Sequence, residues 1–371
     1  MRILFVGEAS FVHNTLQRQL RALGHEVTLM SDGNAWHNSP RDIDVGRNLS
    51  QGKWGGVKLM WRMLRLLPHL RGYDIVQITN PNCVPLRMRW NILLLRYLHR
   101  CNRRIVMGCF GDDPVVISRQ LQGALEYSDI YWDGKPQMQR ENEARICEMS
   151  LPECWSAERN AVRLASRLVP CLYEYQVLYD IEPYRNKLTY QSLPIDLPPL
   201  SEVRVKGEHF PLRILVGIQR DRDYLKGAAV MAEWLQTIAD EHPDKVQILR
   251  AENVPYAEYC RMLDEADVMV DQLYSYTPAM NALAAMARGT VVIGGGEEEY
   301  YRFIGEQTLR PIINVRPDRP DESLRTLREV LLQPGRIAEM SRQSRLFVEK
   351  YHDARLVAQS YEQMYRTLLA E

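Results

Sequence analysis

Two short apolar runs, each ending at a glycine, constrain the fold of this 371-residue chain more than any other feature. RILFVG occupies residues 2–7, and RILVG occupies residues 213–217. Both runs have the β-branched and aliphatic composition of a strand that leads into a turn. A chain of this length exceeds the usual size of a single hydrophobic core. The repeat therefore predicts two α/β domains with equivalent first strands.

Strand-like and helical segments alternate after each of these runs. In the first half, an amphipathic helix is expected at about residues 14–23, with Gly24 as its stop. Further strands are expected at 26–30, 74–79, 104–110 and 167–172, and in the second half at 246–251, 268–273, 290–295 and 311–315. Alternation of this kind is typical of parallel, doubly wound sheets.

The boundary between the halves is marked by a loss of periodicity. Residues 195–210 carry prolines and mixed charges and show no regular apolar spacing. A final helical pattern at about 354–369 can pack back across the first domain. We therefore expect an N-terminal Rossmann-like domain, a linker, a C-terminal Rossmann-like domain and a C-terminal helix, at 1–196, 197–211, 212–352 and 353–371.

Composition is that of an ordinary soluble protein. The formal net charge is zero, with 46% hydrophobic and 25% charged residues, so nucleic acid is not the expected partner. The seven cysteines are scattered without a CxxC pair or zinc spacing, which favours a reducing cytoplasm. The N-terminus lacks the pattern of a signal peptide, and no run approaches the ~20 apolar residues of a membrane span. We expect a cytoplasmic protein.

Charge is nevertheless distributed unevenly. Residues 53–104 contain eleven Lys or Arg residues and a single acid, Asp74. Within this region, 54–69 and 86–104 mix apolar residues, including tryptophan, with basic ones. Basic amphipathic helices of this kind can lie on anionic membrane surfaces. They can also be core helices whose basic side chains extend to solvent. Both interpretations stay open, and the first predicts peripheral contact with the inner face of a membrane.

The stretch 271–299, DQLYSYTPAMNALAAMARGTVVIGGGEEE, reads as a strand end, a loop, a small-residue helix and a second strand. Pro278 suits the first turn of the helix, and Gly289 suits its stop. The N-terminus of such a helix is suited to phosphate or pyrophosphate. The following GGGE turn could allow a ligand to approach the backbone closely. On local pattern alone, an ordinary scaffold helix is an equal alternative.

Six segments, taken in order, resemble the retaining GT-B glycosyltransferases of group 1, also called family 4. They are GEASFVHN (7–14), CFGDDP (109–114), LPID (193–196), GIQRDRDYLKGA (217–228), ENVPYAEYCRMLDEADVMVDQ (252–272) and AAMARGTVVIGGGEEE (284–299). The resemblance spans nearly the whole chain. It implies a GT-B fold, in which two Rossmann-like domains face a cleft and the C-terminal helix crosses back to the first domain.

The resemblance also implies which residues bind a nucleotide-sugar donor. Arg220 and Lys226 match the positions that contact the pyrophosphate, for which a planar guanidinium and a mobile ammonium are suited. Residues 252–254 match the loop near the nucleobase. The full set of expected donor contacts is Arg220, Lys226, Glu252, Asn253, Val254, Tyr276, Thr277, Asn281 and Glu298.

Two positions depart from the family pattern. Tyr276 and Ala284 stand where these enzymes have a spaced pair of carboxylates, one of which accepts hydrogen bonds from the ribose hydroxyls. Asn281 could compensate from the same helix, as could one of the three consecutive glutamates that follow the glycine turn, at 297–299.

On the acceptor side, the resemblance offers His13 and Asp113 as catalytic residues that orient the acceptor hydroxyl, with Ser10 and Asn14 as further acceptor contacts. A buried core histidine and a turn-capping aspartate are the alternatives. The implied chemistry is retaining and needs neither a protein nucleophile nor a metal.

The implied function is transfer of a sugar from a UDP- or GDP-linked donor to a glycan or lipid-linked acceptor, in assembly of cell-surface polysaccharide or lipopolysaccharide. The nucleotide sugar is a co-substrate, and no cofactor is expected. Two alternatives stay open: a nucleotide-sugar epimerase of the same architecture, and a non-catalytic scaffold protein that binds a nucleotide sugar.

Overall fold

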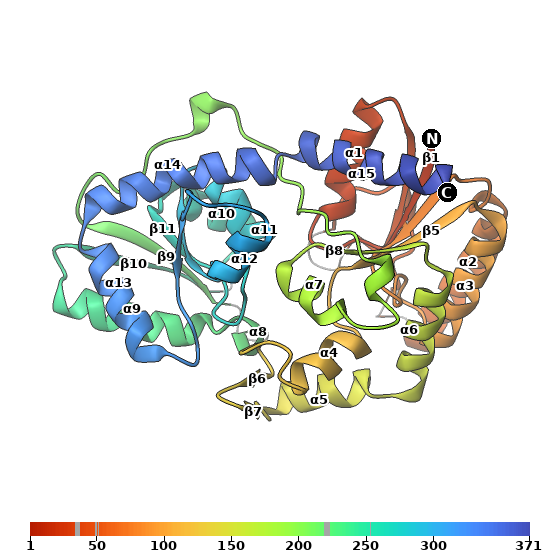
Figure 1. Cartoon of the computed structure of the whole chain (residues 1–371), viewed down its shortest axis with the longest axis horizontal. Coiled ribbons are helices and arrows are strands. Elements are labelled where there is room, and N and C mark those ends of the chain that lie inside the picture. The colour runs from red at the N-terminus through yellow and green to blue at the C-terminus, as the bar shows by residue number, and fades with distance from the viewer. Residues whose placement is uncertain (34–37, 49, 51, 219–222, 253) are drawn as a thin grey trace. The chain divides into compact units, whose positions relative to one another are not determined.

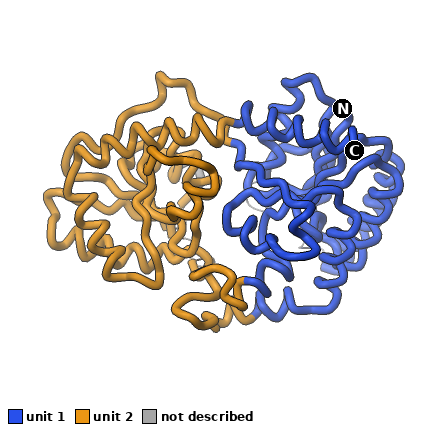
Figure 2. The backbone as a smooth tube through the Cα atoms, in the orientation of Figure 1, with its two compact units in different colours: residues 1–119, 144–194, 354–371 blue, residues 120–143, 195–353 orange. Residues whose placement is uncertain are grey.

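The computed structural model describes residues 1–33, 38–48, 50, 52–218, 223–252 and 254–371. The chain divides into two compact units (Figure 2). Unit 1 comprises Met1–Arg119, Ala144–Pro194 and Ala354–Glu371, and unit 2 comprises Gln120–Glu143 and Ile195–Asp353. Residues 120–143, which lie in the first half of the sequence, therefore fold with the second half.

Unit 1 is built on a six-stranded sheet in the order β3-β2-β1-β4-β5-β8, in which every pairing is parallel. Counted along the chain, this is the strand order of a Rossmann sheet. The apolar run that opens the sequence forms the central strand β1, and its residues Ile3 to Val6 are fully buried. The strands are β1 (Arg2–Val6), β2 (Glu26–Ser31), β3 (Ile43–Asp44), β4 (Ile75–Ile78), β5 (Arg104–Cys109) and β8 (Arg167–Pro170).

Helices connect the parallel strands of unit 1 or follow the last of them (Figure 1). They are α1 (Val12–Ala22), α2 (Gly52–Leu66), α3 (Met88–Cys101), α6 (Pro152–Leu164), α7 (Tyr173–Tyr179) and the C-terminal α15 (Ala354–Ala370), with the short 3-10 helices η3 (Leu67–His69) and η4 (Arg185–Lys187). The helices α4 (Pro114–Leu121) and α5 (Arg140–Met149) carry the chain from one unit to the other.

The C-terminal helix α15 packs in unit 1 against α1. The hydroxyl of Tyr365 donates to Gln77 Oε1 over 2.7 Å, and Nε of Arg104 donates to the carbonyl of Leu368 over 2.9 Å. The prediction that this helix packs back on the first domain is confirmed.

Unit 2 is built on a five-stranded parallel sheet in the order β10-β9-β11-β12-β13. Its strands are β9 (Leu212–Ile218), β10 (Val246–Glu252), β11 (Val268–Val270), β12 (Val291–Gly294) and β13 (Ile312–Asn314). Its helices are α8 (Asp223–Lys226), α9 (Ala228–Glu241), α10 (Tyr256–Glu265), α11 (Met280–Met286), α12 (Glu298–Phe303), α13 (Pro320–Leu331), α14 (Pro334–Tyr351) and the 3-10 helix η5 (Leu200–Glu202). A hairpin of β6 (Tyr131–Trp132) and β7 (Lys135–Pro136) also belongs to it.

The predicted α/β class with two parallel sheets is confirmed, and each predicted strand coincides with an observed one. Three elements were missed, namely β3, β6 and β7, because two-residue strands carry too few residues to show an apolar period. The helix expected to include Pro278 begins at Met280, since Ala279 before it is extended (φ −89°, ψ −179°).

Candidate functional site

Strand order reverses in unit 2 between β9 and β11, because the chain passes from β9 outward to β10 and then back to β11 on the other side. Parallel α/β sheets bind ligands at the carboxyl ends of their strands at such a switch point, where neighbouring loops diverge. The segments that leave β9 and β11 carry most of the predicted donor contacts. Arg220 and Asn253 lie outside the described residues.

Lys226 is fixed at this end of the sheet through its backbone. It is the last residue of α8, and its carbonyl accepts a hydrogen bond from the amide of Leu273 in the loop after β11 over 2.7 Å. Lys226 is half-buried, and the charge of its ammonium group partly offsets the rise that burial causes in the pKa of Asp271.

Asp271 is a functional candidate that the sequence analysis missed. It follows β11 directly, is only 5% exposed, and burial raises the pKa of its carboxyl group. Oδ2 lies 3.5 Å from the amide of Ala279, whereas Oδ1 has no hydrogen-bond partner among the residues that the structure describes. The sequence feature that could have indicated Asp271 is an acid inside the apolar run VMVDQL. Burying a carboxylate without a partner costs free energy, so such a residue often has a functional reason.

The glycine turn after β12 is required by protein packing. A Cβ atom on Gly295 would lie 2.0 Å from the carbonyl oxygen of Ser275, and one on Gly294 would lie 3.1 Å from that of Gln272. The turn therefore lies directly against the loop after β11, and only glycine permits this approach.

Tyr276 stands at the first of the two positions where the family that the sequence resembles has a carboxylate. In this structure its side chain contacts the segment 120–143, which belongs to unit 2. Its ring stacks on that of Tyr127, with centroids 4.5 Å apart and planes at 17°. Its hydroxyl oxygen accepts hydrogen bonds from the amides of Glu126 (3.0 Å) and Tyr127 (3.3 Å). We call these contacts the tyrosine anchor. Tyr127 is fully buried, and its hydroxyl lies 2.8 Å from Glu297 Oε1.

The three glutamates after the glycine turn all have partners. Glu297 accepts from Tyr127 and from Asn314 Nδ2 (2.9 Å). Glu298 binds Arg310 through both carboxylate oxygens (2.6 and 2.8 Å), which lowers its pKa, and Glu299 accepts from Arg302 (2.9 Å). If one of these glutamates, such as Glu298, takes the place of a missing carboxylate at the donor, it must first give up its contacts to the protein.

The remaining described donor candidates lie around the same strand ends. Thr277 is buried, and its amide is 3.3 Å from Ser275 Oγ. Asn281 is exposed in the first turn of α11 and donates through Nδ2 to the hydroxyl of Tyr259 over 2.8 Å. Glu252 is the exposed last residue of β10, and Val254 is half-buried.

In unit 1, His13 lies in the core. Its ring stacks on Phe5 at 4.5 Å and meets Phe110 edge-on at 5.7 Å. Nδ1 is 2.8 Å from the carbonyl of Gly7 and Nε2 is 3.1 Å from Gln77 Nε2, so a tautomer with the proton on Nδ1 satisfies both. Burial lowers the pKa of His13 to about 4, which keeps the ring neutral. Direct proton transfer by His13 would require the ring to leave these partners.

The turn after β1 contains a further carboxyl group. Glu8 accepts hydrogen bonds from the amides of Ala9 (2.8 Å), His13 (3.2 Å) and Asn14 (2.9 Å) at the start of α1, and burial raises its pKa to about 7. Asn14 is buried and donates through Nδ2 to the carbonyl of Pro40 over 2.9 Å, whereas Ser10 is exposed. The sequence analysis did not single out Glu8, because glutamate in a loop is usually solvated.

Asp113 is a buried capping residue with an unusual neighbour. Its Oδ1 accepts from the amide of Val116 over 2.9 Å at the start of α4, and Tyr179 donates to its Oδ2. Burial raises the pKa of Asp113 to about 6. Glu158 on α6 is fully buried beside it, and neither of its carboxylate oxygens has a hydrogen-bond partner within the described ranges. Burial, with the nearby charge of Asp113, raises the pKa of Glu158 well above 4.5.

The glycine requirement can be tested by Gly295→Ala. The added methyl group would overlap the carbonyl of Ser275, so we expect a loss of about 1–3 kcal/mol in the free energy of unfolding, measured with urea. Gly335→Ala in the first turn of α14 is the control, because nothing lies within 4 Å of its Cβ position. We expect it to change stability by less than about 0.5 kcal/mol. Equal stability of the two variants would contradict this packing argument.

Glu158→Gln should change how stability depends on pH. Because the folded state raises the pKa of Glu158, its favourable contribution is complete below the unfolded value of about 4.5 and is lost as pH rises toward the folded value. The wild-type protein should therefore lose stability between pH 5 and pH 8 in thermal unfolding. The variant, which cannot ionise, should lose less and should exceed the wild type at pH 8. Parallel curves would show that Glu158 does not titrate in this range.

Similarity to other proteins is confined to structure. No protein-family model matches the chain, and no curated protein matches its sequence. Sucrose-phosphate synthase from Thermosynechococcus elongatus aligns with a TM-score of 0.59 and 14% identity over 100% of both chains. HepE from Anabaena in complex with UDP-glucose aligns with a TM-score of 0.57 and 12% identity over 99% of this chain and 100% of HepE. WaaG, a glycosyltransferase involved in lipopolysaccharide biosynthesis, aligns with a TM-score of 0.56 and 12% identity over 98% and 99%. At these identities the likeness shows the fold, which is GT-B.

Proposed function

We propose that this chain is a glycosyltransferase that binds a nucleotide-activated sugar in unit 2 and transfers the glycosyl group to an acceptor bound by unit 1. The observation that carries the proposal is the grouping of Lys226, Asp271 and the loop 272–279 at the strand switch point of unit 2. Support comes from the shared GT-B fold with HepE, whose structure contains UDP-glucose.

In this proposal, Lys226 and Arg220 offset the charge that develops on the departing diphosphate. Cationic groups positioned in advance stabilise such charge in the transition state as well as in the ground state. The charge of Lys226 favours the ionised form of Asp271 and opposes the effect of burial on its pKa. Within the described residues, no group of three or more His, Cys, Asp or Glu side chains is arranged to hold a metal ion.

On the acceptor side, the geometry favours positioning roles for two of the predicted residues. His13 fixes the turn after β1 through Gly7, and Asp113 caps α4. Ser10 and Asn14 remain the proposed acceptor contacts. Glu8, with its pKa near neutrality, is a further group in this turn that could exchange a proton with an acceptor hydroxyl.

A second candidate function is non-catalytic binding of a nucleotide sugar. It is favoured by Ala284 and by the engagement of Tyr276 in the tyrosine anchor, which leaves neither position with a carboxylate for the donor. A carboxylate that accepts hydrogen bonds from ribose hydroxyls is worth roughly 1.5–3 kcal/mol, so its loss weakens donor binding without abolishing it.

Lys226→Ala tests the donor site. Titration calorimetry with UDP-glucose and GDP-mannose should identify a donor that binds the wild type, and the variant should raise its dissociation constant at least fivefold because a phosphate partner is lost. Lys245→Ala is the control, since Lys245 directly precedes β10, at the opposite end of the same sheet. Unchanged donor binding in Lys226→Ala would remove Lys226 from the site.

Turnover separates the two candidate functions. If the wild-type protein transfers the sugar to a lipid-linked or glycan acceptor, the glycosyltransferase proposal is supported. Donor binding without transfer across an acceptor panel, with activity gained in Ala284→Glu, would support the non-catalytic protein. Epimerised sugar formed from donor alone would support the epimerase.

We further propose that the acceptor is lipid-linked and that α2 contacts the inner face of a membrane during cell-surface glycan assembly. One side of α2 exposes Trp54 (73%), Val57 (51%), Trp61 (59%) and Leu64 (57%), at helical spacing. Lysines and arginines flank this stripe, at positions 53, 58, 62 and 65. Exposed tryptophan beside basic residues suits an anionic bilayer surface. Among the helices of the described residues, none combines the length and apolar character needed to cross a bilayer.

Vesicle sedimentation tests the α2 contact. The wild type should bind phosphatidylglycerol vesicles more strongly than phosphatidylcholine vesicles, and added salt should weaken binding because the attraction is electrostatic. Trp54→Ala with Trp61→Ala should reduce the bound fraction at least threefold. A control pair, Leu200→Ala with Leu346→Ala, removes exposed apolar side chains from unit 2 and should leave binding unchanged. Equal binding by both double variants would reject α2 as the contact.

A further inference from the structure

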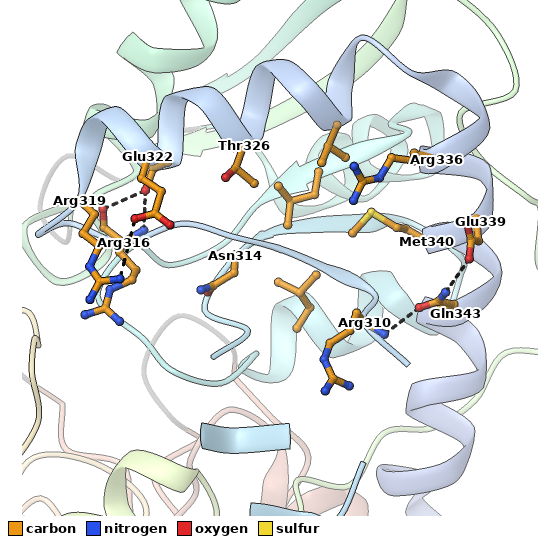
Figure 3. A pocket seen from close by; sticks show the side chains of 14 residues that line it. Arg310, Asn314, Arg316, Arg319, Glu322, Thr326, Arg336, Glu339, Met340 and Gln343 are labelled. Atoms are coloured by element: carbon orange, nitrogen blue, oxygen red, sulfur yellow. Dashed lines mark hydrogen bonds and ion pairs between the residues drawn. The ribbon is translucent and has the colours of Figure 1, made fainter. Parts of the chain in front are cut away.

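We propose that unit 2 has a second binding site, for a small organic anion, in a pocket formed by β13, α13 and α14 (Figure 3). The pocket has a volume of about 440 Å³, and small-molecule sites typically measure about 300–1,000 Å³. All of its lining residues lie between 310 and 343, so it belongs to unit 2 alone. None of the proposed donor contacts lines it, and the inference does not depend on the proposed function.

Part of the pocket lining is apolar, and the other ten lining residues are polar or charged. Ile312 and Ile313 of β13 line it, together with Val330 of α13 and Met340 of α14. These side chains offer a surface on which a ring or a short hydrocarbon chain can be removed from water, which stabilises the bound state in proportion to the apolar area covered. An inorganic ion alone would leave this surface unused.

Four arginines also line the pocket, and two of them are already neutralised. Arg310 forms the paired contacts to Glu298 and lies with its guanidinium 4.3 Å from the ring centre of Tyr301. Arg316 is 2.9 Å from Asp318 and also pairs with Glu126 and Glu297. These two arginines fix the strand ends on either side of β13, and they are not available to a ligand without breaking strong ion pairs.

Arg336 differs because its guanidinium makes no ion pair or hydrogen bond in the described part of the chain, and it is exposed. Figure 3 shows its side chain extending from α14 over the pocket. It lies in the first turn of α14, where no acidic residue is present and where the N-cap Gln333 makes no side-chain capping hydrogen bond. The positive end of an 18-residue helix therefore adds to the charge of Arg336.

The pocket is also lined by Arg319, Glu322, Glu339 and Gln343. Arg319 forms an ion pair with Glu322 at 3.8 Å, a distance longer than a hydrogen bond, and both side chains are exposed. Glu339 is held by Gln343 Nε2 at 3.1 Å, and the same Gln343 accepts from the amide of Arg310. An unpaired guanidinium beside apolar side chains suits a carboxylate or phosphate carried on a ring or short chain, because a planar guanidinium binds either group through two parallel hydrogen bonds.

Two probes represent the two possible anionic groups: phenyl phosphate carries a phosphate on a ring, and benzoate carries a carboxylate on a ring. Calorimetry with the full chain measures the binding of each. At least one of them should bind the wild type, and inorganic phosphate and benzyl alcohol should each bind at least tenfold more weakly. Arg336→Ala should raise the dissociation constant of the bound probe at least tenfold. Arg342→Ala is the matched control on the same helix: Arg342 is exposed, pairs with Glu208 at 3.1 Å and does not line the pocket. The Arg342→Ala variant should bind the probe as tightly as the wild type does.

Three results would overturn the proposal. The first is that neither probe binds the wild type, and the second is that Arg336→Ala binds as tightly as Arg342→Ala. The third is loss of probe binding in Lys226→Ala, because the probe would then occupy the donor site. A failure of the donor proposal alone leaves probe binding and its dependence on Arg336 unchanged.

Discussion

Parallel strand pairing is the constraint on which both units depend. A parallel pair cannot be closed by a tight turn, so each strand must be followed by a crossover, and all strands then end at the same edge of the sheet. In unit 2 this brings the residues after β9, β11 and β12 together, although they are separated by many tens of residues in sequence. Lys226, Asp271 and the glycine turn are neighbours for this reason. Their grouping follows from topology, and the chemistry of the candidate site follows from the grouping.

The packing of the glycine turn gives that site its rigidity. Gly295 lies so close to the backbone after β11 that no larger residue fits, Gly294 is in tight contact with the same loop, and the amide of Glu297 donates to the carbonyl of Tyr276 over 3.2 Å. The turn and the loop therefore form one backbone unit. A ligand that contacts either of them meets a surface that cannot easily adjust, which lowers the entropy cost of binding.

All strands of the two parallel sheets except the two-residue β3 could be predicted from the sequence, because a buried parallel strand is a continuous apolar run that is visible without any knowledge of neighbours. The candidate site was indicated in another way: Lys226 and Thr277 lie in segments whose motifs resemble those of a known family, and both segments follow recognisable strands. The features of the candidate site that could not be predicted are contacts between residues that are distant in sequence. Tyr276 meets Tyr127 across about 150 positions, and no local pattern indicates that contact. Glu158 was missed because it lies among other charged residues of a helix, next to Arg159, so nothing in the local sequence shows that its side chain is buried.

The tyrosine anchor has a consequence for how this sequence can change. Where the glycosyltransferases that the sequence resembles have a carboxylate, this chain has a phenol whose oxygen accepts hydrogen bonds from two backbone amides and whose ring covers a second, fully buried ring. A carboxylate at position 276 could accept from those amides, but it would leave Tyr127 without its stacking partner and would place a negative charge near Glu126, whose charge already raises the pKa of Tyr276. Positions 127 and 276 are thus exchangeable only together. The departure from the family pattern at Tyr276 is tied to a segment of chain more than a hundred residues away, so it could be reversed only by coordinated substitutions.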